Sequence, residues 1–253
     1  MSWLYTIVAS ILEGLTEFLP ISSTGHLIVL NYIFKIEHSD LISSFNIFIQ
    51  SGAILAVINQ YKSELAKNRQ ILVNLFFSFL PTAIIGFTLY PLIKEYLLNS
   101  IFLVCLSLII GGIIIFFLKD PKTSTKIDLK KSILIGTLQA VSIIPGSSRA
   151  LMVIIGGLLA RQSLKDSIRY SFLLAIPTIL SATALDLYQS RNVLINQMPF
   201  LPHFLVGALI SFFSAKIVVT KFIAFISTES RFIYFGYYRI ILGLVILTLT
   251  TLI

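Results

Sequence analysis

Two short stretches of this apolar chain hold the ionisable and hydroxyl side chains that could do chemistry. The first, residues 13–30, contains two carboxylates, three consecutive hydroxyls and an imidazole: Glu13, Glu17, Ser22, Ser23, Thr24 and His26. The second, residues 139–151, contains two adjacent hydroxyls followed directly by a guanidinium: Ser147, Ser148 and Arg149. Charged groups inside apolar segments are costly, so by default they mark functional sites. We expect the two stretches to meet in one site for an anionic substrate.

The spacing of Glu13 and Glu17 stacks two carboxylates on one face of a helix. Like charges in a dry site repel each other, so something must compensate them. A divalent cation, a shared proton or Arg149 would serve. Mg²⁺ and Ca²⁺ take oxygen ligands, and Mg²⁺ often combines one or two carboxylates with substrate phosphate. A structural ion pair, or carboxylates that reach the membrane interface, is the alternative without function.

The hydroxyls of the first stretch follow Pro20. Proline lacks an N–H and disfavours helix at the preceding residue, so one helix should end there and Ser22, Ser23 or Thr24 should cap the next. The N-terminus of that second helix favours an anion. One hydroxyl could instead be a nucleophile activated by a nearby base. His26 is a candidate general acid or base, or else a hydrogen-bonded core residue.

A Pro-Gly pair interrupts the second stretch in the same way, so Ser147 or Ser148 should cap the helix that follows. The planar guanidinium of Arg149 suits bidentate phosphate contacts. A structural bridge to one of the glutamates is the alternative, and the two roles are compatible if phosphate displaces the carboxylate. Asn46 and Gln50, one turn apart at the start of an apolar run, are further donors for the mouth of the site.

The composition identifies an integral membrane protein. Hydrophobic residues make up 57% of the chain and charged residues 12%, about half the charged fraction of an ordinary soluble domain. The apolar runs approach or exceed the roughly 20 residues that cross a bilayer as a helix. We therefore predict an all-α polytopic protein of the lipid bilayer. The net charge of +8 lies in short loops, which is typical of cytoplasmic loops and argues against nucleic-acid binding.

The apolar runs follow one plan twice. Each half starts with a broken segment, near residues 1–31 and 132–160. Three continuous runs follow each broken segment, near 45–59, 71–91 and 101–118, and near 169–188, 203–225 and 232–253. A shift of 125 positions aligns the two Pro-x-Ser-Ser motifs and keeps later blocks in register, which indicates an internal repeat. We interpret residues 1–253 as one membrane domain, with repeat one at about 1–118, a linker at 119–131 and repeat two at about 132–253.

The odd number of spans in each half gives the two halves opposite orientations in the membrane. This is the plan of two inverted repeats, each a re-entrant helix pair plus three transmembrane helices, with the site where the broken helices meet. The loops near 60–70, 119–131, 161–169 and 216–231 hold fourteen Lys and Arg residues, against three on the other side. By the positive-inside rule these loops are cytoplasmic, so both termini and the mouth of the site face outward.

The segments EGLTEFLPISSTGH, PGSSR and SFLLAIPTILSATALDL together closely resemble the bacterial undecaprenyl-diphosphate phosphatase family of the bacitracin-resistance type. The resemblance covers nearly the whole chain. It implies a re-entrant, inverted-repeat enzyme that removes one phosphate from undecaprenyl diphosphate and regenerates the lipid carrier for cell-wall synthesis. By position it also implies these roles: catalysis by Glu13 and Glu17, nucleophile or phosphate ligand at Ser23, acid or base at His26, phosphate clamp at Arg149, and support from Thr24 and Ser148.

The second motif departs from the family pattern, which usually continues Ser-Gly after the arginine where this chain has Ala150-Leu151. We expect a diphosphatase acting on a polyprenyl diphosphate at the outer face of the bacterial cytoplasmic membrane, with a divalent cation held by Glu13 and Glu17 and a homodimer as one option. Ser23 attacks with Glu17 or His26 as base, or water attacks directly. The rival is a transporter of an anionic lipid or small anion, because broken helices and inverted repeats are typical of transporters.

Overall fold

Every regular element that the computed structural model describes is helical, and the described residues are 1–37, 39–88, 100–226 and 229–251. The first half contains α1 (Trp3–Thr16), α2 (Ser23–Phe34), α3 (Asp40–Lys67), α4 (Arg69–Thr88) and α6 (Ile101–Phe117). The second half contains α7 (Leu129–Ala140), η2 (Val141–Ile143), α8 (Arg149–Leu159), α9 (Leu164–Gln189), α10 (Arg191–Asn196), η3 (Met198–Phe200), α11 (Leu201–Phe225) and α12 (Glu229–Thr251). Two predicted runs end outside the described residues, at 89–91 and 252–253.

Five of the described helices are long and apolar enough to cross a membrane, namely α3, α4, α9, α11 and α12. α6 is more apolar than these five helices but has only 17 residues. Large apolar side chains cover the outside of the bundle, and Phe87 and Phe117 are 74% and 78% exposed. Hydrocarbon solvates such a surface, whereas water does not. The chain is therefore an all-α, multi-pass membrane protein, as the composition predicted.

α3 and α7 begin before the apolar segments that predicted them, because a polar residue caps each start. α3 starts well before the run at 45–59, since the hydroxyl of Ser39 accepts a hydrogen bond from the Ile42 N–H at 3.3 Å. α7 starts inside the predicted linker, where the carboxylate of Asp128 accepts a bond from the Lys131 N–H at 2.9 Å. Residues 129–131 of that linker are thus helical.

Both predicted breaks are present. α1 and α2 are separated by a turn, and so are α7 and α8, with the short η2 between them. The second helix of each pair has its N-cap position at Ser22 and at Ser148, both among the predicted residues. The Ser148 hydroxyl accepts from the Leu151 N–H at 3.3 Å, whereas the Ser22 side chain makes no capping hydrogen bond. Both serines have positive φ, 67° and 71°, a region that residues other than glycine rarely adopt and that often accompanies functional sites.

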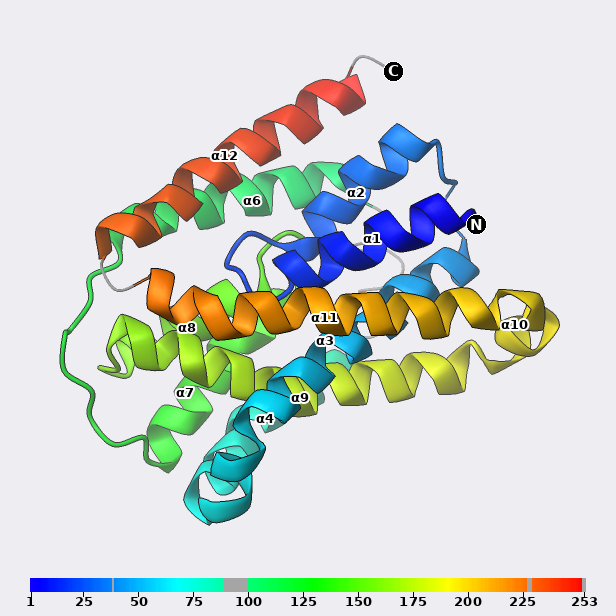
Figure 1. The fold of residues 1–253 in the computed structure, drawn as a ribbon. Helices are drawn as coiled ribbons and strands as arrows, with labels where there is room; N and C mark the ends of the chain where they lie inside the picture. Colours follow the sequence, from blue (N-terminus) through cyan, green and yellow to red (C-terminus); the bar gives the residue numbers. More distant parts are fainter. Residues whose placement is uncertain (38, 89–99, 227–228, 252–253) are drawn as a thin grey trace.

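Each broken segment packs against a long helix from the other half of the chain. α1 lies along α11, and α7 lies along α4 (Figure 1). α3 and α9 contact each other between them, while α6 and α12 run side by side as a pair. The largest buried cluster draws on both halves, with Phe18 and Val57 from the first and Leu151 and Phe172 from the second. The breaks are therefore held at the centre of the bundle.

A close backbone contact joins α4 to α7. The Ser78 hydroxyl donates to the carbonyl of Ser132 at 2.8 Å, and the Thr82 hydroxyl donates to the carbonyl of Gly136 at 3.2 Å. A Cβ atom on Gly136 would overlap the backbone of Ser78. Glycine and two hydroxyls thus let the helices approach closely, which is the usual means of helix association without a hydrophobic driving force.

Gly136→Ala should lower thermal stability, because the added methyl forces α4 and α7 apart. Overpacking of this kind costs about 1–3 kcal/mol, which lowers the Tm of a chain of this size by roughly 2–12 °C. The measurement is the Tm of purified protein in detergent. The matched control is Gly86→Ala in α4, where the nearest atom to the new methyl is 3.9 Å away. Equal Tm values for the two variants would contradict the close contact.

Candidate active site

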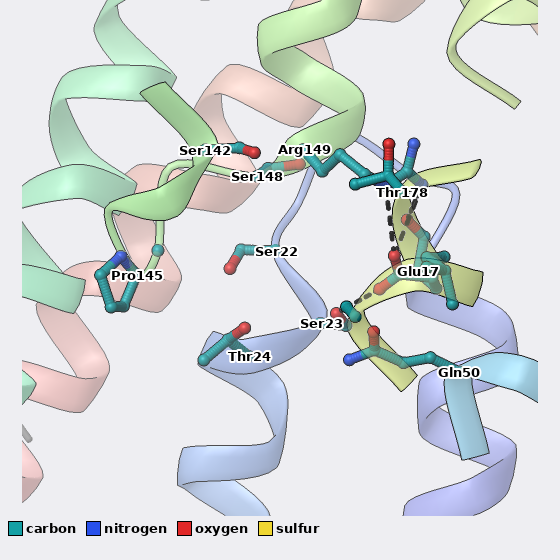
Figure 2. A pocket seen from close by; sticks show the side chains of 13 residues that line it. Glu17, Ser22, Ser23, Thr24, Gln50, Ser142, Pro145, Ser148, Arg149 and Thr178 are labelled. Atoms are coloured by element: carbon teal, nitrogen blue, oxygen red, sulfur yellow. Dashed lines mark hydrogen bonds and ion pairs between the residues drawn. The ribbon is translucent and has the colours of Figure 1, made fainter. Parts of the chain in front are cut away.

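The two breaks and two long helices surround a cavity of about 170 Å³, roughly ten times the space that one water molecule needs. Its lining combines the first break, the second break, α3 and α9: Glu17, Ser22, Ser23 and Thr24; Ser142, Pro145, Gly146, Ser148 and Arg149; Gln50; and Thr178, Ile179 and Ala182. Figure 2 shows these side chains converging from both halves of the chain. The two stretches selected from the sequence thus meet, as predicted.

Glu17 is the centre of the polar contacts in this cavity. One carboxylate oxygen, Oε2, accepts a hydrogen bond from the Ser23 hydroxyl at 2.7 Å. The other, Oε1, lies 3.4 Å from both Nε and Nη2 of Arg149 (Figure 2). The carboxylate is therefore placed to take the Ser23 proton while the guanidinium stabilises its charge, which is the geometry of a base beside a nucleophile.

Arg149 is the first residue of α8, and its guanidinium is fixed by several contacts. Nη1 donates to the carbonyl of Ser171 at 2.9 Å, and Nη2 lies 3.5 Å from the Glu17 carbonyl. The guanidinium carbon lies 5.9 Å from the centre of the Phe18 ring. α2 also begins at this cavity, so two helix N-termini and a fixed guanidinium face the same space. Such a site favours an anion, and a phosphate group in particular.

Glu13 lies behind Glu17, fully buried, and it does not line the cavity. Within the described part of the chain neither of its carboxylate oxygens has a hydrogen-bond partner, although Glu17 and Ser23 are its neighbours. A buried carboxylate beside another one needs a proton or a cation. No cluster of three or more His, Cys, Asp and Glu side chains occurs among the described residues. The two glutamates do fit Mg²⁺ or Ca²⁺ in ligand type, since Mg²⁺ commonly uses one or two protein carboxylates.

His26 lies beside the cavity but does not line it. Its Nδ1 donates to the carbonyl of Ser22 at 2.8 Å. In the neutral ring Nε2 then accepts from the Tyr238 hydroxyl, at 2.6 Å, and the two rings stack. The imidazole is therefore connected to the site by its hydrogen bond to the Ser22 backbone carbonyl, and both ring nitrogens already have hydrogen-bond partners.

The remaining predicted residues divide between the cavity and its surroundings. Ser22, Thr24, Ser148 and Gln50 line it. Ser147 does not, and its hydroxyl instead donates to the carbonyl of Ile144 at 2.6 Å within the second break. Asn46 lies outside the lining too, with its side-chain oxygen 3.5 Å from the Tyr5 hydroxyl.

Several residues around the site were missing from the sequence prediction. Ser142 and Thr178 line the cavity. From α12, Tyr238 contacts His26 and Arg239 contacts both breaks. Arg239 carried a usable signal, because it is a charged residue inside a predicted span, the same property that singled out Glu13. Ser142 and Thr178 carried none, since a hydroxyl in an apolar helix usually bonds only to its own backbone.

Comparison with known proteins matches residues 6–245 to the family model described as bacitracin resistance protein BacA. A protein of Aquifex aeolicus (strain VF5) named undecaprenyl-diphosphatase is 43% identical over 249 residues, covering 94% of this chain and 95% of the relative. Undecaprenyl-diphosphatases of Campylobacter fetus subsp. fetus (strain 82-40) and Persephonella marina (strain DSM 14350 / EX-H1) are each 40% identical, with 98% of both chains covered.

The geometry of the guanidinium predicts how the cavity binds an anion. Arg149→Lys should weaken binding of inorganic pyrophosphate at least roughly tenfold, or about 1.4 kcal/mol, because an ammonium cannot reproduce the planar fork. Isothermal titration in detergent measures this. The matched control is Arg169→Lys, since Arg169 also forms an ion pair, with Glu64 away from the cavity. Equal affinities for the two variants would exclude Arg149 as the anion clamp.

Proposed function

We propose that this chain, which belongs to the family of the bacitracin resistance protein BacA, hydrolyses undecaprenyl diphosphate to undecaprenyl phosphate and inorganic phosphate. The product is the lipid carrier that cell-wall synthesis reuses. One observation supports the proposal most directly. Glu17 accepts a hydrogen bond from the Ser23 hydroxyl and forms an ion pair with Arg149, at a cavity where two helices begin. Phosphoryl transfer needs mainly positioning and charge stabilisation from a protein, and this cluster supplies both.

In the first step the Ser23 oxygen attacks the terminal phosphorus of the diphosphate. The bond from Ser23 Oγ to phosphorus forms, the bond from phosphorus to the bridging oxygen breaks, and undecaprenyl phosphate leaves. The serine proton passes to Glu17 Oε2, which already accepts it at 2.7 Å. Arg149 exchanges part of its contact with Glu17 for phosphate oxygens, so it stabilises the charge on the transferred group.

In the second step water attacks the phosphoserine and releases inorganic phosphate. The bond from the water oxygen to phosphorus forms and the bond from phosphorus to Ser23 Oγ breaks, while the serine oxygen recovers the proton held by Glu17. One proton of the water stays on the phosphate, and the other passes to solvent. Direct attack of water on the diphosphate, with Glu17 or His26 as base, is the alternative route to the same products. The short contact between Ser23 and Glu17 supports the serine route, while His26, bonded to Ser22 and Tyr238, is better placed to orient the first break.

The nucleophile test separates the two routes. On the serine route, Ser23→Ala should abolish phosphate release even at saturating substrate, and rapid-quench mass spectrometry of the wild type should trap a phosphorylated Ser23. Ser22→Ala, which changes the neighbouring hydroxyl of the same lining, is the matched control for the trapping experiment. Substantial turnover in Ser23→Ala, together with no phosphorylated serine in the wild type, would favour attack by water. A purified wild-type protein that releases no phosphate would instead favour an anion transporter.

The divalent cation belongs to the same proposal. Glu13 and Glu17 would hold Mg²⁺ or Ca²⁺, which when bound neutralises charge on the phosphate oxygens. The buried Glu13 oxygens without partners support this assignment.

Chelation with EDTA should therefore stop phosphate release by the wild type, and added Mg²⁺ or Ca²⁺ should restore it. Glu13→Gln should raise the metal concentration needed for half-maximal activity, because one anionic ligand is lost. The control is Glu64→Gln, whose carboxylate pairs with Arg169 instead. Full activity in EDTA would indicate that a shared proton, and not a cation, compensates the negative charge of the two glutamates.

The membrane arrangement is also part of the proposal: two inverted repeats with re-entrant broken segments, in the cytoplasmic membrane, with the site and both termini on the outer face. The exchanged packing of α1 on α11 and α7 on α4 supports the repeat, as do the matched positive-φ residues Ser22 and Ser148. The N-terminus and the end of α12 lie at the same end of the bundle, and the long basic linker after α6 lies at the other (Figure 1).

A reporter enzyme that works only outside the cytoplasm should be active when fused after Ile253 and inactive when inserted in the linker at Lys122. The linker fusion is the matched control, because the positive-inside rule assigns its five Lys residues, Lys119 to Lys131, to the cytoplasm. Activity only in the linker fusion would reverse the assignment.

A further inference from the structure

Arg239 is a buried arginine that the proposed reaction does not use. It lies near the middle of α12, and its relative exposure is 0%. Within the described part of the chain it forms no ion pair, and its Nε has no hydrogen-bond partner. A buried charge without a counter-charge is costly. Its terminal nitrogens must therefore make contacts that offset this cost.

Those contacts are backbone carbonyls from three separate segments. Nη1 donates to Pro20 at 3.2 Å, in the first break. Nη2 donates to Gly146 at 2.9 Å and lies 3.3 Å from the carbonyl of Ser147, both in the second break. Nη2 also donates to Ser107 of α6 at 3.0 Å. One guanidinium thus bonds both breaks to each other and to the α6 and α12 pair.

The surroundings are built around this side chain. A Cβ atom on Gly111 of α6 would overlap the Arg239 guanidinium, so glycine there makes the space for it. Gly146 has φ of +87°, and a Cβ on it would lie 2.5 Å from the carbonyl of Val104 on α6. The second break is therefore seated directly on α6 where Arg239 reaches it.

The carbonyls that accept hydrogen bonds from Arg239 lie close in sequence to the residues of the two halves of the site. Ser23 lies three residues after Pro20, and Arg149 lies three residues after Gly146. The contact that joins those halves, from Arg149 to Glu17, is 3.4 Å long. A displacement of about 1 Å can cost a hundredfold in rate, so a residue that holds both breaks controls the alignment of the reacting groups.

We propose that Arg239 is a positioning residue that holds the two breaks in register, so that Ser23 and Glu17 of one face Arg149 of the other. This proposal rests on the proposed diphosphatase function for its kinetic consequences only. The guanidinium needs its planar fork because the carbonyls lie in different segments. An ammonium carries the same charge but presents its donors from one atom, and cannot reach all of them.

The test compares Arg239→Lys and Gly111→Ala with wild type, using Arg169→Lys as the matched control. Gly111→Ala keeps Arg239 but displaces its guanidinium, so this variant replaces Arg239→Lys in the test if the lysine variant does not fold. Hydrogen exchange followed by mass spectrometry should rise in both breaks together, residues 17–24 and 141–149, and stay unchanged in α3. Phosphate release from undecaprenyl diphosphate should show kcat lowered roughly tenfold or more, with KM within about threefold of wild type.

A double-mutant cycle makes the test specific. Because Arg239 acts through the break that carries Arg149, the Arg149→Lys and Arg239→Lys pair should lose little more activity than Arg149→Lys alone. The proposal would be overturned if Arg239→Lys folds with a lower Tm but keeps normal kcat and normal hydrogen exchange in both breaks. It would also be overturned if the loss of activity in the double variant equals the product of the losses in the two single variants. A wild type that releases no phosphate would defeat the proposed function, while raised exchange in both breaks of the variants would still support the positioning role.

Discussion

Backbone polar groups that leave a helix inside hydrocarbon need partners other than water, and this constraint governs the centre of the molecule. The chain meets it twice, once at each break. The Ser22 carbonyl accepts from His26, and the Pro20 carbonyl accepts from Arg239. In the second break the same arginine reaches Gly146. Polar side chains that a bilayer would otherwise exclude are therefore stabilising here. The breaks that they hold carry other polar side chains, Glu17, Ser23 and Arg149, which face the cavity.

The ion pair between Glu17 and Arg149 is the second interaction on which the site depends. Each is a nearly buried charge, with 8% and 10% of its side chain exposed, and each stabilises the other. Removing one partner would leave the other charge uncompensated, which typically costs about 3–5 kcal/mol. In the proposed reaction the phosphate takes over the guanidinium while the carboxylate takes a proton from Ser23. Under that proposal the exchange of partners keeps the charge in the site nearly balanced.

The sequence predicted the features that depend on local chemistry. Pro20 and the Pro-Gly pair located the breaks, apolar length located the long helices, and costly charges located Glu17 and Arg149. It did not predict features that depend on packing between distant segments. The hydroxyl of Ser147 could not be distinguished from that of Ser148 by type, yet one bonds within its own turn and the other lines the cavity. The occupied nitrogens of His26 depend on Tyr238, a residue from the last helix whose position relative to the first break no local pattern encodes.

The exchanged packing of the broken segments has a consequence for how the protein is made. α1 leaves the ribosome long before α11, the helix along which it packs. Contacts between segments so far apart in sequence form late, because closing a long loop is entropically costly. The contact between α1, which carries the buried Glu13, and α11 can therefore form only after α11 has been synthesised. Neither half completes its own core, because the largest buried cluster combines residues of both, so the two halves become stable together as one unit.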